Sequence, residues 1–237
     1  MINTTFIRTI RDNLFDFVAP EHCAICNKHI KPNTAQFKML CNACLNSIPY
    51  APPPNIIRNR LYEHFSEEMV SIDGATSLLS LKENTQYLQA IHKFKYEGLS
   101  QLAYEYGKLL GRRMQIDGMT KYEYIIPVPI HKVKYRERGY NQSYYIALGL
   151  NGFVSGDMSD DFVRRNQYTK TQTALSKEQR KHNVRNIYEI NKKFDPYGSR
   201  ILLVDDVLTT GSTINSLAGS LKSAGAESCD CATVAIA

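Results

Sequence analysis

The hydrophobic pattern is clearest near the C-terminal end of the chain. Residues 201–204 are a run of large aliphatic side chains, which is typical of a strand buried on both faces. Ile214, Leu217 and Leu221 then recur at the spacing of one helix face, and Gly225 follows as a helix stop. Residues 229–237 predict a further strand. This order predicts a parallel βαβ unit with a right-handed crossover.

Similar patterns upstream predict more strands and helices. One or two strands around an Asp73-Gly74 turn are expected in 70–82, and two helices separated by Gly98 in 85–114. The remaining expectations are a strand at 124–128, a helix at 143–150, a surface loop at 151–161, a strand at 162–164 and a helix at 177–185. The pattern predicts an α/β domain over 70–237, with a parallel sheet flanked by helices.

The N-terminal part has a different composition. Residues 1–20 space their apolar side chains as an amphipathic helix does, and 21–48 contain a four-cysteine module. Residues 49–69 are a proline-rich linker that we expect to be extended. The charged residues among the first 20 interrupt any secretory signal, and the sequence has no membrane-spanning run of apolar residues. With six cysteines and no such signal, we expect a cytoplasmic protein.

The four cysteines of this module are spaced as in a zinc site. Cys23 and Cys26 form one CxxC pair, and Cys41 and Cys44 form another after fourteen intervening residues. Two such pairs can supply four thiolates in tetrahedral geometry. The alternative is a redox role, although a redox CxxC normally occurs once, in a thioredoxin-like context. The sequence therefore predicts a structural zinc ion.

Positive charge is concentrated in one segment. Residues 131–200 contain fourteen Lys and Arg against seven Asp and Glu, a net charge of +7. The whole chain has a formal charge of +6, so the rest of it is nearly neutral, at −1. Such a segment indicates an anionic partner, either the phosphates of a small ligand or a nucleic acid. A solvated surface is the alternative.

Two acids and a hydroxyl-rich loop follow the strand at 201–204. Asp205 and Asp206 would stand at the carboxyl end of that strand, where ligands bind in α/β sheets. Adjacent carboxylates repel each other unless ribose hydroxyls or a cation compensate. The loop at the start of the next helix can hold a phosphate with its backbone N–H groups. Its residues are Thr209, Thr210, Gly211, Ser212 and Thr213. Ser and Thr are also ordinary helix caps, but a cap does not need the acid pair.

The run at 201–213 resembles the signature of type I phosphoribosyltransferases, which bind 5-phosphoribosyl-1-pyrophosphate (PRPP). The resemblance implies that Asp205 and Asp206 contact the ribose hydroxyls and that residues 209–213 surround the 5-phosphate. It also implies magnesium held chiefly by the ligand.

A narrower resemblance covers most of the chain. Several short segments lie between the cysteines and the signature: PVPIH at 127–131, RERGYNQS at 136–143, Thr171-Gln172, Arg180 and Asn183. This combination is similar to the ComF family of competence-associated proteins. The resemblance implies a role in the uptake of transforming DNA, a PRPP-binding domain and a competence helicase as a candidate partner.

The basic residues in the loop expected after the strand at 124–128 are candidates for two ligands. If the domain is phosphoribosyltransferase-like, the turn with Val128, Pro129 and His131 holds the pyrophosphate, and Arg136 and Arg138 contact it or close over it. Aromatic side chains among these cations also suit unpaired bases. The candidates for contact with single-stranded DNA are Lys132, Lys134, Tyr135, Arg136, Arg138 and Tyr140.

Three functions remain open on the sequence. The first is a PRPP-binding, zinc-containing protein that contacts single-stranded DNA in the cytosol during natural transformation. The second is a metabolic phosphoribosyltransferase that transfers the pentosyl group to an unidentified base, although the sequence does not show where a base would bind. The third is a regulatory sensor that binds PRPP without turnover.

Overall fold

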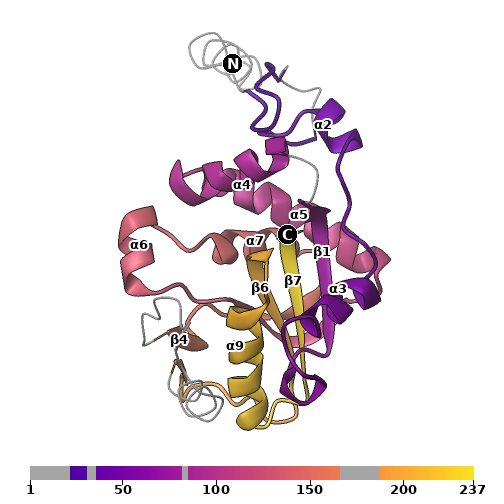
Figure 1. The fold of residues 1–237 in the computed structure, drawn as a ribbon. Coiled ribbons are helices and arrows are strands. Elements are labelled where there is room, and N and C mark those ends of the chain that lie inside the picture. The colour runs from indigo at the N-terminus through magenta and orange to yellow at the C-terminus, as the bar shows by residue number, and fades with distance from the viewer. Residues whose placement is uncertain (1–21, 31–35, 82–84, 166–186) are drawn as a thin grey trace, which may run out of the picture.

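The fold is built on a parallel sheet. The computed structural model describes residues 22–30, 36–81, 85–165 and 187–237. Its five-stranded sheet has the order β1-β7-β6-β2-β3, and every pair of neighbours is parallel. Figure 1 shows β1, β7 and β6 side by side in this sheet. The strands are β1 (Gly74–Ser80), β2 (Lys121–Pro127), β3 (Ser155–Met158), β6 (Arg200–Leu208) and β7 (Ser228–Ile236). The predicted α/β class and the C-terminal βαβ unit are confirmed.

Helices pack on both faces of this sheet. Leu202 and Val204 of β6 share an apolar cluster with α4 (Thr85–Tyr96), α5 (Ser100–Ile116) and α7 (Gln142–Leu150). Ile201 and Leu203 alternate with them and pack with α3 (Pro54–Leu61) and α9 (Ser212–Ser223) on the other face. Because side chains alternate along a strand, β6 is buried on both faces, as its aliphatic run predicts.

Smaller elements lie around this framework. They are α2 (Asn42–Asn46), the 3-10 turn η1 (Glu67–Met69), α6 (Lys132–Arg138) and an antiparallel pair of β4 (Val163–Arg165) with β5 (Tyr188–Ile190). No helix in the described part of the chain is both long and apolar enough to cross a membrane. The helices expected at 1–20 and 177–185 lie outside the described residues.

Several local expectations were wrong. Asp73-Gly74 does not turn between two strands, because Gly74 begins the single strand β1 and the Asp73 carboxylate accepts a hydrogen bond from the Cys229 N–H at 2.8 Å. Residues 151–161 are not entirely loop, since β3 lies within them and pairs with β2. The two helices expected in 85–114 are confirmed, since Gly98, with a φ of 72°, separates α4 from α5, and α5 continues to Ile116.

The linker at 49–69 is not extended throughout. Pro53 and Pro54 stand at the N-cap and first turn of α3, where a missing N–H costs nothing. Ile57 and Leu61 of this helix are buried in the apolar cluster beneath the sheet. The prolines therefore start a helix that packs on the core, and the domain boundaries drawn from composition stay a prediction.

Candidate functional site

The candidate site lies where β2 ends beside β6, which continues for four more residues to Leu208. Pro127 of β2 is in register with Val204 of β6, and the Val128 N–H donates to the Val204 carbonyl at 2.8 Å. The turn that follows β2 therefore starts next to Asp205. This is the carboxyl edge of a parallel sheet, where ligands bind in this class of fold.

Asp205 is held by its own strand and by α7. Its Oδ1 accepts hydrogen bonds from the Ser143 hydroxyl at 2.9 Å and from the Asp206 N–H at 2.8 Å. Burial, and after it the nearby charge of Asp206, raise the pKa of Asp205 to about 7. Near neutral pH this carboxyl group can therefore be either protonated or ionised.

Asp206 faces the other helices of the site. Its Oδ2 lies 3.1 Å from the Lys95 ammonium of α4 and accepts a hydrogen bond from Gln142 Nε2 at 3.3 Å. The sequence indicated that something must compensate two adjacent carboxylates. In the free protein Lys95, more than a hundred residues away along the chain, does so for Asp206.

The loop from Thr209 to Thr213 surrounds a small pocket. Gly211 is the N-cap of α9 with a φ of 74°, a conformation that glycine adopts without strain. A Cβ at this position would lie 2.4 Å from Leu61 Cδ2, so a larger residue would also force the buried Leu61 side chain of α3 to move. The pocket has a volume of about 50 Å³ and is lined by Asp205, Val207, Leu208, Thr209, Gly211, Ser212, Thr213 and Ile214.

This pocket suits an anion. It lies at the start of a 12-residue helix, where the first N–H groups have no partner within the helix and the helix dipole favours negative charge. Thr210 and Ser212 are exposed, and their hydroxyl oxygens lie 3.2 Å apart. Because the Thr210 hydroxyl donates to the Ser212 oxygen, the Ser212 hydroxyl is the one that can donate a hydrogen bond to a phosphate in the pocket. Of the residues predicted from the sequence, 205, 209 and 211–213 thus line one pocket, whereas Asp206 and Thr210 lie outside its lining.

The basic segment after β2 is a helix rather than a loop. His131 caps α6, since its Nδ1 accepts a hydrogen bond from the Val133 N–H at 3.2 Å. No residue of α6 is buried, so Lys132, Lys134 and Arg136 are exposed. Tyr135 is 53% exposed. The helix offers cations and one aromatic ring to solvent, close in sequence to the turn at 128–131.

Arg138 and Tyr140 are more enclosed. The Arg138 guanidinium lies over the Tyr96 ring, 5.2 Å from its centroid. The Tyr140 hydroxyl donates to the Phe94 carbonyl, and its ring contacts Tyr145 edge to face. Both residues connect this segment to α4, whereas Tyr135 presents its ring freely. Whether any of them contacts pyrophosphate or DNA stays a prediction.

Sequence reasoning missed the site residues that come from helices. Lys95 carries no local signal, because its partner is distant in the sequence. Gln142 and Ser143 lie in the RERGYNQS segment, which identified the family resemblance but did not reveal their contacts. Asn141 Nδ2 in the same segment donates to the Val128 carbonyl at 3.1 Å. Three consecutive side chains thus join the acid pair to the turn after β2.

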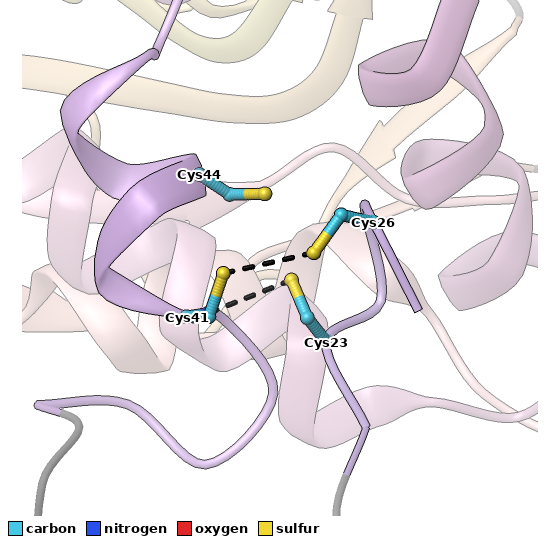
Figure 2. Close-up of side chains that lie close together, drawn as sticks. All are labelled: Cys23, Cys26, Cys41 and Cys44. Carbon is cyan, nitrogen blue, oxygen red and sulfur yellow. Dashed lines mark hydrogen bonds between the residues drawn. The ribbon is translucent and has the colours of Figure 1, made fainter. Parts of the chain in front are cut away.

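The four cysteines form a second candidate site. Figure 2 shows the side chains of Cys23, Cys26, Cys41 and Cys44 pointing toward one another. Their sulfur atoms all lie within 4.8 Å of one another, and those of Cys26 and Cys41 are 3.7 Å apart. Four thiolates at about 2.3 Å from a tetrahedral zinc ion would be about 3.8 Å apart. The geometry therefore fits a zinc ion without rearrangement of the chain.

The local environment also suits a thiolate. Burial disfavours ionisation of Cys23, but the backbone N–H groups of Cys26, Cys41 and Ile25 outweigh it together and lower the pKa of Cys23 to about 7. Burial raises the pKa values of Cys41 and Cys44. A cation among the four sulfur atoms would favour the ionised form of all of them.

The cysteine module is attached to the main domain through α4 and α5. Glu105 of α5 is buried, and its carboxylate accepts hydrogen bonds from the N–H groups of Lys38 at 2.8 Å and Met39 at 3.0 Å. The Tyr87 hydroxyl donates to the Cys44 carbonyl at 2.7 Å, and the Lys93 ammonium donates to the Ala24 carbonyl at 3.0 Å. Helix α4 therefore contacts the cysteine module with two side chains and Asp206 with a third, Lys95.

Comparison with known proteins agrees with this architecture. The phosphoribosyl transferase domain family matches residues 147–236, which include the acid pair and the loop. The chain is 37% identical over 107 residues to competence protein F of Haemophilus influenzae, an alignment that covers 44% of this chain and 46% of that protein. It is 31% identical over 140 residues to the DNA utilization protein YhgH of Shigella flexneri, covering 57% and 61%. These alignments span about half to three fifths of the length of the relatives.

Among solved structures, the glutamine PRPP amidotransferase of B. subtilis matches 60% of this chain and 30% of its own, with 17% identity and a TM-score of 0.43. The family match includes the strand and loop that carry the acid pair, and the relatives are competence and DNA utilization proteins. Residues 147–236 thus match the phosphoribosyl transferase domain family, and the chain is similar to competence protein F and to the DNA utilization protein YhgH.

Proposed function

We propose that this protein binds PRPP with magnesium and acts on single-stranded DNA in the cytosol during DNA uptake. The observation that carries the PRPP part is the pocket at the end of β6. It joins a carboxylate, which can accept hydrogen bonds from ribose hydroxyls, to a helix N-terminus, which can hold a phosphate. A phosphorylated ribose carries both hydroxyl groups for the carboxylate and a phosphate for the helix N-terminus. Magnesium would be held chiefly by the ligand's phosphates.

The turn after β2 supports a place for the pyrophosphate. It starts next to Asp205, because Val128 is hydrogen-bonded to Val204. The exposed cations of α6 follow at once and can approach the negative charge of a pyrophosphate. In this proposal Val128, Pro129 and His131 shape the subsite, while Arg136 and Arg138 bring positive charge to it.

The DNA part rests on the family and on the surface of α6. The relatives are named for competence and for DNA utilization, and the helix offers Lys132, Lys134 and Arg136 beside the exposed Tyr135. Cations neutralise backbone phosphates and release counterions, while an aromatic ring stacks on an unpaired base. Tyr135 is the better candidate for stacking, because Tyr140 already makes contacts within the protein.

Two binding assays test this function. PRPP with magnesium should raise the melting temperature, since a ligand that binds only the folded state stabilises it. Labelled single-stranded DNA should bind with an affinity that decreases steadily with salt, and more tightly than duplex. Replacing Lys132, Lys134 and Arg136 together by Ala should reduce the salt dependence. An unchanged melting temperature would contradict PRPP binding, and equal DNA binding by the triple variant would contradict the role of α6.

A metabolic phosphoribosyltransferase is the second candidate, and the complete acid pair and loop favour it. A turnover assay separates the two functions. The protein is incubated with PRPP, magnesium and a panel of bases, and released pyrophosphate is measured. Release that depends on one base would establish pentosyl transfer, whereas binding without release in the whole panel favours a role in which PRPP is bound and not consumed.

A further inference from the structure

Gln142 is a buried side chain that contacts the acid pair, and its own hydrogen bonds are incomplete. It is the first residue of α7 and is 1% exposed. Its Nε2 donates to Asp206 Oδ2 at 3.3 Å. Its Oε1 is buried and, within the part of the chain that the structure describes, has no hydrogen-bond partner. Buried acceptors are normally satisfied, so an unpaired one next to a candidate ligand site is informative.

The orientation of this amide follows from its neighbour. An ionised carboxylate only accepts hydrogen bonds, so the nitrogen of Gln142 must face Asp206. The oxygen is attached to the same carbon and is therefore fixed beside the carboxylate, turned away from it. The nearby donors are already engaged: the Lys95 ammonium pairs with Asp206, and the Ser143 hydroxyl donates to Asp205. The described residues therefore leave this oxygen free to accept a hydrogen bond from a water molecule or from a ligand.

We propose that Gln142 is a ribose-binding residue whose amide oxygen accepts a hydrogen bond from a ribose hydroxyl of the ligand. This inference rests on the proposed PRPP site and adds to it a residue outside the acid pair and the loop. A hydroxyl group both donates and accepts, so it can donate to Gln142 and accept from the Lys95 ammonium beside it. The Gln142 nitrogen meanwhile keeps Asp206 in place.

The neighbours of Gln142 support a role in ligand binding. Asn141 donates to the Val128 carbonyl in the turn assigned to the pyrophosphate, and Ser143 donates to Asp205. Gln142 lies between them at the start of α7, so the same short segment contacts the ribose side and the pyrophosphate side of the site. Of these three side chains, only Gln142 has a buried atom without a partner.

The test compares ligands that differ by one hydroxyl. Calorimetry or competition measures ligand binding to the wild type and to Gln142→Met, which keeps the size of the side chain but lacks the amide. The ligands are PRPP with magnesium, ribose 5-phosphate, and the 2-deoxy and 3-deoxy forms of ribose 5-phosphate. Gln115→Met is the matched control, because Gln115 is exposed and its amide bonds only the Phe153 carbonyl in the described structure. Apo melting temperatures check that each variant is folded.

The proposal predicts that Gln142→Met weakens PRPP and ribose 5-phosphate by about 3- to 10-fold, the effect of one hydrogen bond between uncharged groups. The loss should be smaller for the deoxy ligand that lacks the contacted hydroxyl. An equal loss for every ligand would mean that Gln142 only positions Asp206 and would overturn the proposal, as would no loss at all. If Gln142→Met does not fold, wild-type binding that is equal for all three sugar phosphates would overturn it. A wild type that does not bind PRPP would instead refute the proposed function.

Discussion

The buried carboxyl group of Asp205 should make the free protein less stable at neutral pH. Its pKa is raised from 3.8 to about 7, by burial first and by the charge of Asp206 second. The unfolded chain loses this proton near pH 4 and the folded chain near pH 7. Between these values the folded state binds more protons than the unfolded state, so stability falls as pH rises and stays lower above pH 7.

Asp205→Asn should remove this loss. A shift of about 3 pKa units corresponds to at most about 4 kcal/mol. The amide oxygen of Asn can still accept from the Ser143 hydroxyl and the Asp206 N–H. We therefore expect the apo variant to be about 1–4 kcal/mol more stable than the wild type at pH 8. For a chain of this size each kcal/mol raises the melting temperature by roughly 2–4 °C.

Urea denaturation of both proteins between pH 5 and pH 8 measures this difference. The advantage of Asp205→Asn should grow from pH 5 to about pH 7 and then remain constant. Asp157→Asn is the control, because Asp157 is an exposed acid in β3. An advantage that is the same at pH 5 and pH 8, or a variant less stable than the wild type at pH 8, would refute this reasoning.

Three further predictions concern the cysteine module and the core. Purified protein should contain about one zinc ion per chain by metal analysis, and Cys41→Ser should lose it; zinc retained by the variant would contradict the site. Glu105→Gln should lower the free energy of unfolding, measured by urea denaturation, by about 1–3 kcal/mol, because one N–H of the module loses its acceptor. A variant as stable as the wild type would mean that the hydrogen bonds from Lys38 and Met39 to Glu105 do not stabilise the fold. Gly107→Ala should cost at least about 2 kcal/mol, since its Cβ would lie 2.1 Å from the Ile146 carbonyl oxygen, whereas Gly152→Ala, with open space around it, should be nearly neutral.

The architecture of the sheet was predictable because strong local patterns encode it. The aliphatic run at 201–204 and the helical spacing from Ile214 to Leu221 have one simple interpretation each, and β6 and α9 match them. The acid pair and loop were predictable for the same reason, since strand, acids and glycine are contiguous. Elements that depend on tertiary packing were not. The strand β3 contains Ser, Gly and Asp, and it exists because β2 offers it an edge.

The same distinction applies to the functional residues. The four cysteines have a spacing that identifies them, and the structure brings them together. Lys95 could not be found, because α4 carries both Lys93 and Lys95 and only the fold shows which one reaches Asp206. The basic segment was expected as a loop, although Gly139, with a φ of 79°, ends a helix there in the usual left-handed conformation.

Calorimetric titration of the wild type and Asp205→Asn with PRPP and magnesium at pH 7.5 tests the central claim most directly. One molecule of PRPP should bind per chain in the wild type, and the variant should bind at least about 10-fold more weakly, because hydrogen bonds to a charged acceptor contribute more than those to a neutral amide. The same variant should be the more stable protein without ligand. No saturable binding by the wild type, or equal Kd values for the two proteins, would contradict the assignment of the pocket at the end of β6 to a phosphorylated ribose.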